Sequence, residues 1–192
     1  MSTFQQETLP GFTIWLTGLS ASGKSTLALH LERYLASRQR EVEVLDGDVV
    51  RSYLCGDLGF SREDRNLNIK RITFVCSLLA RHGVICITSA ISPYREARDR
   101  ARRDLNRFVE VYVRCPIEMC RVRDPKGLYA LVDQGRLSNF TGVDDPYEEP
   151  LHPEIVVETA TSTIEACVAQ IIAGITLAGY LEPDLPVDAV CN

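Results

Sequence analysis

The run GLSASGKST, residues 18–26, has the spacing G-x-x-x-x-G-K-[ST] of a loop that binds nucleotide phosphates. Glycines there let backbone N–H groups point at the phosphates, and the start of the following helix adds its positive dipole end. Lys24 can reach the β- and γ-phosphates, and Ser25 can hold Mg²⁺. The run predicts a nucleoside triphosphate site made of Gly18, Leu19, Ser20, Ala21, Ser22, Gly23, Lys24, Ser25 and Thr26.

Two carboxylates follow in the run LDGDVVR, where Asp46 and Asp48 stand on either side of Gly47. One carboxylate in such a place can deprotonate an incoming hydroxyl, and another can hold magnesium through water, for which we take Asp46. Arg51 comes one turn after Asp48 and is a candidate for binding an anion. The structural alternative is a turn in which Asp48 caps a helix N-terminus.

The run GFSREDRNLNIKR, residues 59–71, offers further groups for an acceptor molecule. Arg65 and Asn68 are three residues apart on an expected helix and therefore share a face. Phe60 can stack on a base or pack inside the protein. For Arg65 the structural alternative is an ordinary solvated helix face.

A long segment of weak periodicity runs from residue 121 to residue 153 and includes RDPKGLY, SNFTG and DDPYEEP. Segments of this length in compact domains are usually lids or binding loops. Arg121, Arg123 and Lys126 lie in it, and arginines from a mobile lid can neutralise charge on a transferring phosphoryl group. The alternative is a charged loop without a function of its own.

Short apolar runs alternate with longer helical patterns along the chain. Strands are predicted at residues 12–18, 41–47, 84–90, 108–114 and 154–159. Helices are predicted at 24–38, at 61–83 with Ser61 as N-cap and Gly83 as stop, and from about Pro93. A last helix at 163–179 is expected to begin with a capping box of Ser162 and Glu165.

This alternation predicts an α/β fold of the P-loop nucleoside-triphosphate-hydrolase type. We expect a five-stranded, mainly parallel sheet with helices on both faces and a lid. Ligands of such sheets bind at the carboxyl ends of the strands, where every candidate loop above begins. The 192 residues suit one domain, with a core at about 12–180 and a loose tail at 181–192.

The composition limits which binding partners and which cellular compartment can be expected. A net charge of −5 argues against broad nucleic-acid binding, and the longest apolar runs are too short to span a membrane. The N-terminus shows no secretory signal or transit peptide. Seven cysteines without a C-x-x-C pair indicate reduced, mostly buried thiols in a cytoplasmic protein. The three histidines do not cluster with the cysteines in the sequence, as a zinc site would require.

Taken together, these runs resemble the adenylylsulfate kinases, also called APS kinases. The matching segments are GLSASGKST, LDGDVVR, DLGFSREDRNLNIKR, AISPYREARDR, RDPKGLY and NFTGVDDPYEEP, between residues 18 and 150. The phosphate loop is common to many families, whereas the combination is specific. The resemblance implies an ATP:adenylylsulfate 3′-phosphotransferase, which uses MgATP and adenosine 5′-phosphosulfate (APS) to make 3′-phosphoadenosine 5′-phosphosulfate (PAPS), and which forms homodimers.

The resemblance also implies a role for each candidate residue. Asp48 would accept the 3′-hydroxyl proton, Arg51 and Arg65 would bind the phosphosulfate, and Phe60 and Phe140 would sandwich the acceptor adenine. Contacts to ATP beyond the phosphate loop are implied for Arg121, Arg123 and Ser162. The implied catalytic residues are Lys24, Asp48 and Ser92, and the implied magnesium ligands are Ser25 and Asp46. The residues implied to bind the acceptor are Asp48, Arg51, Phe60, Arg65, Asn68, Ile91, Ser92, Lys126, Asn139 and Phe140.

The chain departs from the family pattern at a few positions. Ala21 stands where glycine is usual, Val49 where asparagine is usual, and Leu67 and Lys70 where glutamate and arginine are usual. These changes bear on affinity or on the dimer surface rather than on the reaction. Two other functions stay open: another P-loop kinase, such as a nucleoside monophosphate kinase, and a non-catalytic nucleotide-binding regulator of a sulfurylase.

Ser92, in the run ISPYR, has two interpretations. Family descriptions label this serine as a phosphoserine intermediate. Its place before Pro93 also suits a helix N-cap, and a loop after a strand would let Ile91 and Ser92 touch the acceptor. No histidine or other base is near it in sequence to activate it as a nucleophile. Direct transfer with Asp48 as the base needs no covalent step. The arginines after it are expected to lie mostly on a solvated helix face.

Overall fold

The computed structural model describes residues 10–183, and the strands among them form one five-stranded sheet. The strands are β1 (Thr13–Thr17), β2 (Val42–Asp46), β3 (Ile85–Ser89), β4 (Phe108–Arg114) and β5 (Ile155–Glu158). Their order is β2-β3-β1-β4-β5, and every neighbouring pair is parallel. All five predicted strands are confirmed, as is the P-loop type of α/β fold.

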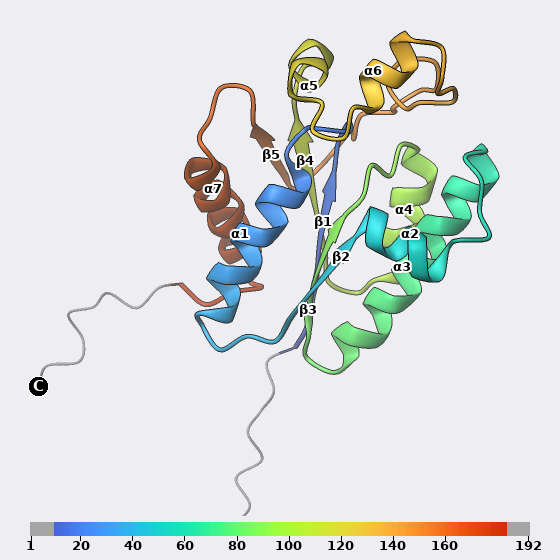
Figure 1. Ribbon diagram of the computed structural model, residues 1–192. Helices are drawn as coiled ribbons and strands as arrows, with labels where there is room; N and C mark the ends of the chain where they lie inside the picture. The colour runs from blue at the N-terminus through green and yellow to red at the C-terminus, as the bar shows by residue number, and fades with distance from the viewer. Residues whose placement is uncertain (1–9, 184–192) are drawn as a thin grey trace, which may run out of the picture.

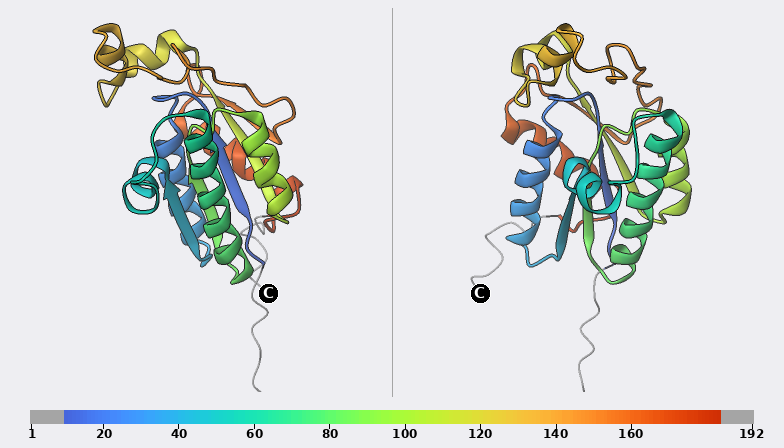
Figure 2. Two further views of the ribbon diagram at one scale, coloured as in Figure 1. Left: turned by 90° about the vertical axis from the view of Figure 1, so that its right-hand side faces the viewer. Right: turned by 45° about the vertical axis from the view of Figure 1, so that its right-hand side comes forward.

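Helices cover both faces of the sheet (Figures 1 and 2). α1 (Lys24–Ala36) and α7 (Ile164–Leu177) pack on one face, and α3 (Arg62–Arg81) and α4 (Arg95–Asp104) pack on the other. Because both faces are covered, β1 and β3 are buried along their whole length, which explains why apolar residues predominate in them and why neither carries a charge. Among residues 10–183, no helix is long and apolar enough to cross a membrane.

Three short helices lie at the carboxyl edge of the sheet, and the sequence indicated a helix only for the first of them, as the alternative interpretation of LDGDVVR. They are α2 (Gly47–Leu54), α5 (Ile117–Arg123) and α6 (Leu128–Asp133). α5 and α6 form the upper part of the predicted lid (Figure 1). They pack around a small apolar cluster that includes Cys115, Cys120, Tyr129 and Phe140. Their six or seven residues are too few to show a helical period, so the sequence did not reveal them.

Helix caps test the sequence prediction most closely. Ser61 caps α3 as expected, since its Oγ accepts the Asp64 N–H at 3.1 Å. The capping box assigned to Ser162 is wrong, because Thr163 is the cap and accepts the Ala166 N–H at 3.2 Å. An N-cap side chain accepts a hydrogen bond from the backbone N–H of the third residue of its helix. Because α7 begins at Ile164, the residue in that position is Thr163 and not Ser162.

The prediction of Ser92 as a cap is also wrong. α4 begins at Arg95 and its N-cap is Tyr94, whose side chain makes no cap bond; the Arg95 backbone N–H instead donates to Glu148 Oε2 at 2.9 Å. Ser92 instead lies two residues before that cap, with a left-handed backbone of φ 48°. The loop after β3 therefore extends further than the sequence indicated.

Six of the seven cysteines lie in the described part of the chain, and all six are free and buried, as predicted. Cys191 lies outside the described residues. Most of the tail predicted to be loose, residues 184–192, lies outside them too.

Candidate active site

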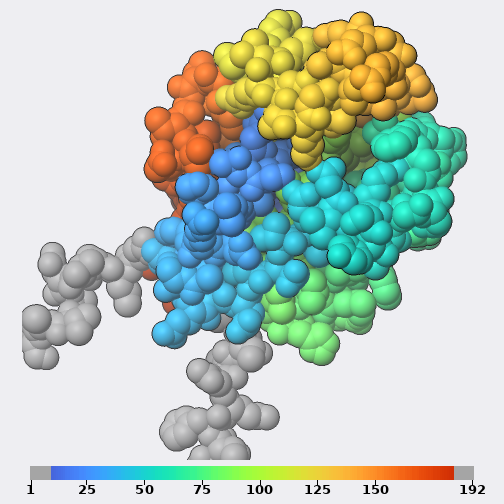
Figure 3. Space-filling view, in the orientation of Figure 1, coloured from blue at the N-terminus to red at the C-terminus, as the bar shows by residue number. Residues whose placement is uncertain are grey.

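A cavity of about 570 Å³ opens at the carboxyl edge of the sheet. Its walls come from the loops after β1, β2 and β3, from the start of α3, and from the segment between α5 and α6. Figure 3 shows the hollow below the lid and above α1 and α2. Parallel strands end at one edge, so the fold brings the separate sequence motifs to one place.

The phosphate loop forms the floor of this cavity. Ser20, Ala21, Gly23, Lys24, Ser25 and Thr26 line it, whereas Gly18, Leu19 and Ser22 do not. Gly18 is needed for close packing, because a Cβ there would lie 2.5 Å from the Val113 carbonyl oxygen. Ala21 has a left-handed φ of 61°, which costs a residue with a Cβ about 1–2 kcal/mol. The glycine that is usual at this position would avoid that cost.

Lys24 lies buried at the base of the loop. Its Nζ donates to the carbonyl oxygens of Gly18 at 2.9 Å and Leu19 at 2.7 Å. The pKa of Lys24 is lowered from 10.5 to about 8, mainly by burial and also by the charge of Lys126, whereas Cys120, Asp46 and Asp48 act to raise it. An anionic phosphate in the cavity would favour the charged form of this ammonium group.

Ser25 and Asp46 meet at the start of α1, as predicted for the magnesium ligands. The Ser25 Oγ donates to Asp46 Oδ2 at 2.7 Å and lies 3.1 Å from Ser89 Oγ. The other oxygen of Asp46 accepts the Asp48 N–H at 3.0 Å, so Asp46 and not Asp48 is the cap of α2. The hydroxyl and carboxylate oxygens here are the hard ligands that Mg²⁺ takes beside phosphate oxygens and water.

Asp48 projects from the first turn of α2 into the cavity. Its carboxylate forms an ion pair with the Lys126 ammonium of the lid. The two side chains are 71% and 53% exposed, so both are open to a ligand. The lid thereby places a positive charge beside the carboxylate that sequence analysis assigned to proton transfer.

Arg51, Phe60 and Arg65 form a basic wall with an aromatic centre. The Arg51 guanidinium lies 4.2 Å from the centre of the Phe60 ring, and the Arg65 guanidinium lies 5.6 Å from it. Burial lowers the pKa of Arg51, and the charge of Arg65 adds to this effect. Two arginines this close together make the wall basic, although Arg65 Nε also lies 3.5 Å from Asp145 Oδ2.

Arg65 is not on a solvated helix face, so that alternative is wrong. Its side chain is 10% exposed, and it donates to the carbonyl oxygens of Phe60 at 2.9 Å and Asn139 at 2.5 Å. Asn68 lies beside it in the cavity wall, and its buried Oδ1 has no hydrogen-bond partner among the described residues. A buried amide oxygen at a cavity wall is ready to accept a hydrogen bond from a ligand.

Some predicted site residues lie apart from the cavity wall. Phe140 is buried, with its ring edge-on to Tyr129 at 4.9 Å between centres, and neither it nor Asn139 lines the cavity. Arg121 also lies away from the wall and pairs with Asp133 at 2.6 Å. Arg123 does line the cavity.

Arg123 and Ser162 line the cavity near the end of β5. The Arg123 guanidinium donates to the carbonyl oxygen of Thr159 at 2.5 Å, and the Thr159 hydroxyl donates to the Ser22 carbonyl at 2.7 Å. These bonds join the lid and the loop after β5 to the phosphate loop. Arg123 and Ser162 therefore line the same cavity as the phosphate loop, and their contact with a nucleotide stays a prediction.

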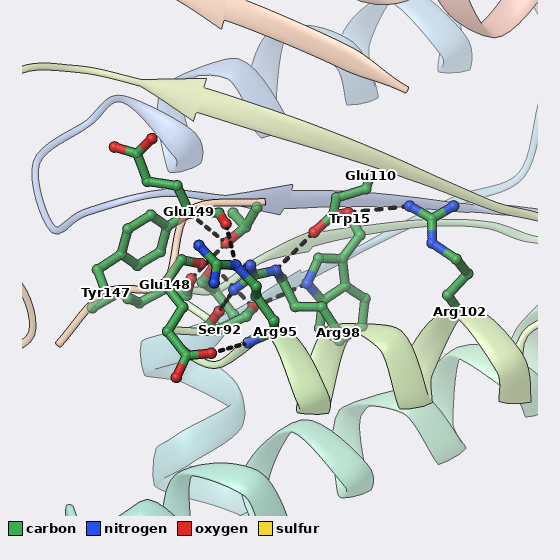
Figure 4. Close-up of polar contacts among 12 residues, drawn as sticks. Trp15, Ser92, Arg95, Arg98, Arg102, Glu110, Tyr147, Glu148 and Glu149 are labelled. Atoms are coloured by element: carbon green, nitrogen blue, oxygen red, sulfur yellow. Dashed lines mark hydrogen bonds and ion pairs between the residues drawn. The ribbon is translucent and has the colours of Figure 1, made fainter. Parts of the chain in front are cut away.

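Ser92 lines the cavity, but its hydroxyl is engaged inside the protein. The Ser92 Oγ accepts the Trp15 Nε1–H at 3.0 Å and donates to the Ala90 carbonyl at 3.3 Å (Figure 4). The residue is 2% exposed. None of the groups that bond this hydroxyl is a base that could activate it.

The expectation of a solvated arginine face on α4 is wrong for Arg98. This side chain is 2% exposed and pairs with Glu110 of β4 at 2.7 Å. The sequence held a signal for this pair, because Glu110 is a carboxylate in the middle of the apolar run FVEVYVR. A charge at a buried strand position requires a partner of opposite charge. Ser89, at the end of β3, does line the cavity, and no sequence pattern indicated a role for it.

The phosphate loop, the carboxylate at the end of β2 and the basic lid define a P-loop kinase. A sequence model of the family described as adenylylsulphate kinase matches residues 10–158. The chain belongs to the adenylylsulfate kinase family.

Similar proteins agree with this assignment. An adenylyl-sulfate kinase of Rippkaea orientalis is 52% identical over 171 residues, which are 89% of this chain and 94% of that protein. A probable bifunctional SAT/APS kinase of Sorangium cellulosum is 50% identical, and the match is 30% of its length. The solved APS kinase of Mycobacterium tuberculosis in complex with AMPPNP and APS is 40% identical, with a TM-score of 0.84 over 87% of this chain and 98% of that one.

Proposed function

We propose that this protein transfers the γ-phosphoryl group of MgATP to the 3′-hydroxyl of adenosine 5′-phosphosulfate, giving PAPS and ADP in sulfate assimilation. The observation that carries the proposal is the position of Asp48. Its carboxylate lines the same cavity as Lys24, Arg51 and Arg65, and it is close enough for its charge to act on both Lys24 and Arg51. A hydroxyl acceptor with an anionic tail fits between them.

ATP is proposed to lie with its phosphates in the loop of residues 18–26. Backbone N–H groups and the start of α1 attract the phosphates, and Lys24 supplies a positive charge where the γ-phosphoryl group leaves. Arg123 and Ser162 then flank the nucleotide on the side of β5. Arg121, which pairs with Asp133, would reach ATP only if the lid moves.

Ser25 and Asp46 would hold Mg²⁺, Ser25 directly and Asp46 through water. Their oxygens lie together at the start of α1 and suit a hard cation. When bound, the ion neutralises charge on the phosphate oxygens during transfer. The residues themselves orient the phosphate loop, because Asp46 bonds both the Ser25 hydroxyl and the Asp48 N–H.

The acceptor is proposed to bind on the other side of Asp48. Arg51 and Arg65 would hold the phosphosulfate, Phe60 would stack on the adenine, and Asn68 would accept a hydrogen bond with its free Oδ1. Asp48 then takes the proton of the 3′-hydroxyl as that oxygen attacks the γ-phosphorus. Positioning and charge neutralisation supply most of the rate in phosphoryl transfer.

Phe140 and Asn139 stay predictions as acceptor contacts. Phe140 packs against Tyr129 inside the lid cluster, so a second ring on the adenine requires the lid to move. The homodimer and the cytoplasmic location also stay predictions.

Direct transfer, without a phosphoserine, is the route that the Ser92 contacts favour. We expect Ser92→Ala to lower the free energy of unfolding by about 1–3 kcal/mol, because the buried Trp15 Nε1–H loses its acceptor. The variant should retain most of its turnover, and no phosphoprotein should form from γ-labelled ATP. Ser52→Ala, on the exposed face of α2, is the matched control. Abolished turnover with intact APS binding would favour the covalent intermediate instead.

ATP binding should take up protons above neutral pH. Lys24 has a pKa of about 8 in the free protein, so at pH 8.5 this group is mostly neutral, and phosphate charge raises its pKa on binding. We expect an uptake of about 0.7 proton per ATP at pH 8.5 and about 0.1 from this group at pH 7. Calorimetry in buffers of different ionisation enthalpy measures this uptake. Equal uptake in Lys24→Met would assign it to another group.

A panel of acceptors tests the proposed function. With MgATP, the rate of ADP formation should rise with APS and not with AMP or CMP. Turnover of the monophosphates without turnover of APS would support the alternative of a nucleoside monophosphate kinase. Nucleotide binding without any turnover would support the non-catalytic regulator.

A further inference from the structure

The loop Ile91–Pro93 lines the cavity, and its residues Ile91 and Ser92 are proposed contacts of the acceptor. Its middle residue, Ser92, has a φ of 48°, a region that residues with a Cβ rarely occupy. Such a conformation persists only where the surrounding structure holds it. The contacts behind the loop therefore decide where this wall stands.

Arg98 of α4 lies directly behind the loop and does not line the cavity (Figure 4). Its guanidinium makes three hydrogen bonds to three different segments of the chain. Nη1 donates to the Ser92 carbonyl at 2.5 Å, Nε to Glu110 Oε1 at 2.7 Å, and Nη2 to the Glu148 carbonyl at 2.6 Å. The rigid, planar fork of arginine fixes the angles among these three acceptors.

The partners of Arg98 are held in turn by the fold. Glu110 lies in β4, and its backbone N–H donates to Glu154 at 2.7 Å. The Glu148 N–H donates to the Pro93 carbonyl at 2.8 Å, which closes a ring of bonds around the wall. Arg98 thus connects a rigid strand to the loop Ile91–Pro93, while Thr17 at the end of β1 bonds the Ile91 carbonyl at 2.7 Å.

We propose that Arg98 is a positioning residue for the acceptor. Its guanidinium holds the Ser92 carbonyl and the left-handed turn, and the turn sets the wall that meets the acceptor. This inference rests on the proposed function for the identity of the acceptor. Arg98 forms no hydrogen bond with the phosphate loop, Arg123 or Thr159, so its loss should weaken use of the acceptor and not of ATP.

Replacing Arg98 alone would change both the position of the loop Ile91–Pro93 and the stability of the fold, so the two effects could not be separated. Arg98→Met leaves the Glu110 carboxylate buried without its main partner, which destabilises a protein strongly. Replacing both charges with apolar residues of similar size removes that penalty. The double variant Arg98→Met/Glu110→Leu should therefore regain stability while the Ser92 carbonyl still lacks its donor.

The matched control is Arg102→Met. Arg102 lies one turn further along α4 and also pairs with Glu110, at 3.1 Å, and with Glu154. It has no bond to the loop Ile91–Pro93. A change that acts only through the charge of Glu110 would appear in both variants, whereas a change that acts through the Ser92 carbonyl appears only at Arg98.

The experiment measures KM for APS, KM for ATP and the melting temperature in the wild type, in these three variants and in Arg98→Lys. We expect Arg98→Met and the double variant to raise KM for APS by about 10- to 100-fold with KM for ATP unchanged, and Arg102→Met to leave both unchanged. Arg98→Lys, which keeps the charge and loses the fork, should lie between wild type and Arg98→Met. If Arg98→Met does not fold, the double variant and Arg98→Lys carry the test.

Two results would contradict the inference. A stable double variant with the wild-type KM for APS would show that Arg98 only stabilises the fold. An equal rise in both KM values would show that it does not act on the acceptor side. A wild-type protein that neither binds nor turns over APS would overturn the proposed function and the inference together, so the two failures are distinguishable.

Discussion

Replacing Asp48 with asparagine should lower kcat with MgATP and APS by about 10²–10⁴-fold, because the variant loses its proton acceptor. The amide keeps the shape of the carboxylate and can still accept a hydrogen bond from Lys126. ATP binding should change little, since the phosphate loop is built by contacts of Lys24, Ser25 and Thr159 that do not involve the Asp48 side chain. Steady-state kinetics and calorimetric titration with ATP measure the two effects.

Asp57→Asn is the matched control for Asp48. Asp57 is an exposed carboxylate that pairs with Arg71, and it lies outside the cavity. Its replacement should leave kcat at the wild-type level. A near-normal kcat in Asp48→Asn would refute the assignment of Asp48 as the base.

Replacing Lys24 with methionine should lower kcat by about 10²–10³-fold, the effect of removing one donor that stabilises charge in a transition state. Methionine fills the buried space without a charge, so the phosphate loop loses the bonds to the carbonyl oxygens of Gly18 and Leu19. Because the γ-phosphoryl group gains most from this charge during transfer, kcat should fall by more than ATP affinity does. Single-turnover kinetics separate the two.

Arg33→Met is the control for Lys24, because Arg33 is an exposed cation on the same helix, α1, and lies outside the cavity. We expect it to keep wild-type kinetics. A Lys24→Met variant with a higher KM for ATP and an unchanged kcat would mean that Lys24 only binds the nucleotide.

The sequence predicted the sheet well because its signals are local. Each strand is a short apolar run that ends in a polar loop, and the phosphate loop has a fixed spacing. The meeting of Ser25, Asp46 and Asp48 also followed, since the carboxyl ends of parallel strands lie at one edge. Ser61 could be predicted as a cap because only one hydroxyl residue precedes that helix directly.

The rest depended on contacts between distant segments. The hydrogen bond from Trp15 to Ser92 joins residues 77 positions apart, so no local sequence pattern could predict it. Arg98 follows a helical pattern rich in arginine, and only the position of Glu110 on the neighbouring strand shows that it is buried. Phe140 lies in the lid, whose short helices have no period that a sequence reveals.

The most direct test of the proposed reaction is identification of the product. Purified protein, MgATP and APS are incubated, and the nucleotides are separated and examined by mass spectrometry and phosphorus NMR. We predict ADP together with a product that carries a new phosphate on the ribose 3′-oxygen and retains the sulfate. ADP with free phosphate and unchanged APS, or a new phosphate at any other position, would contradict the proposed reaction.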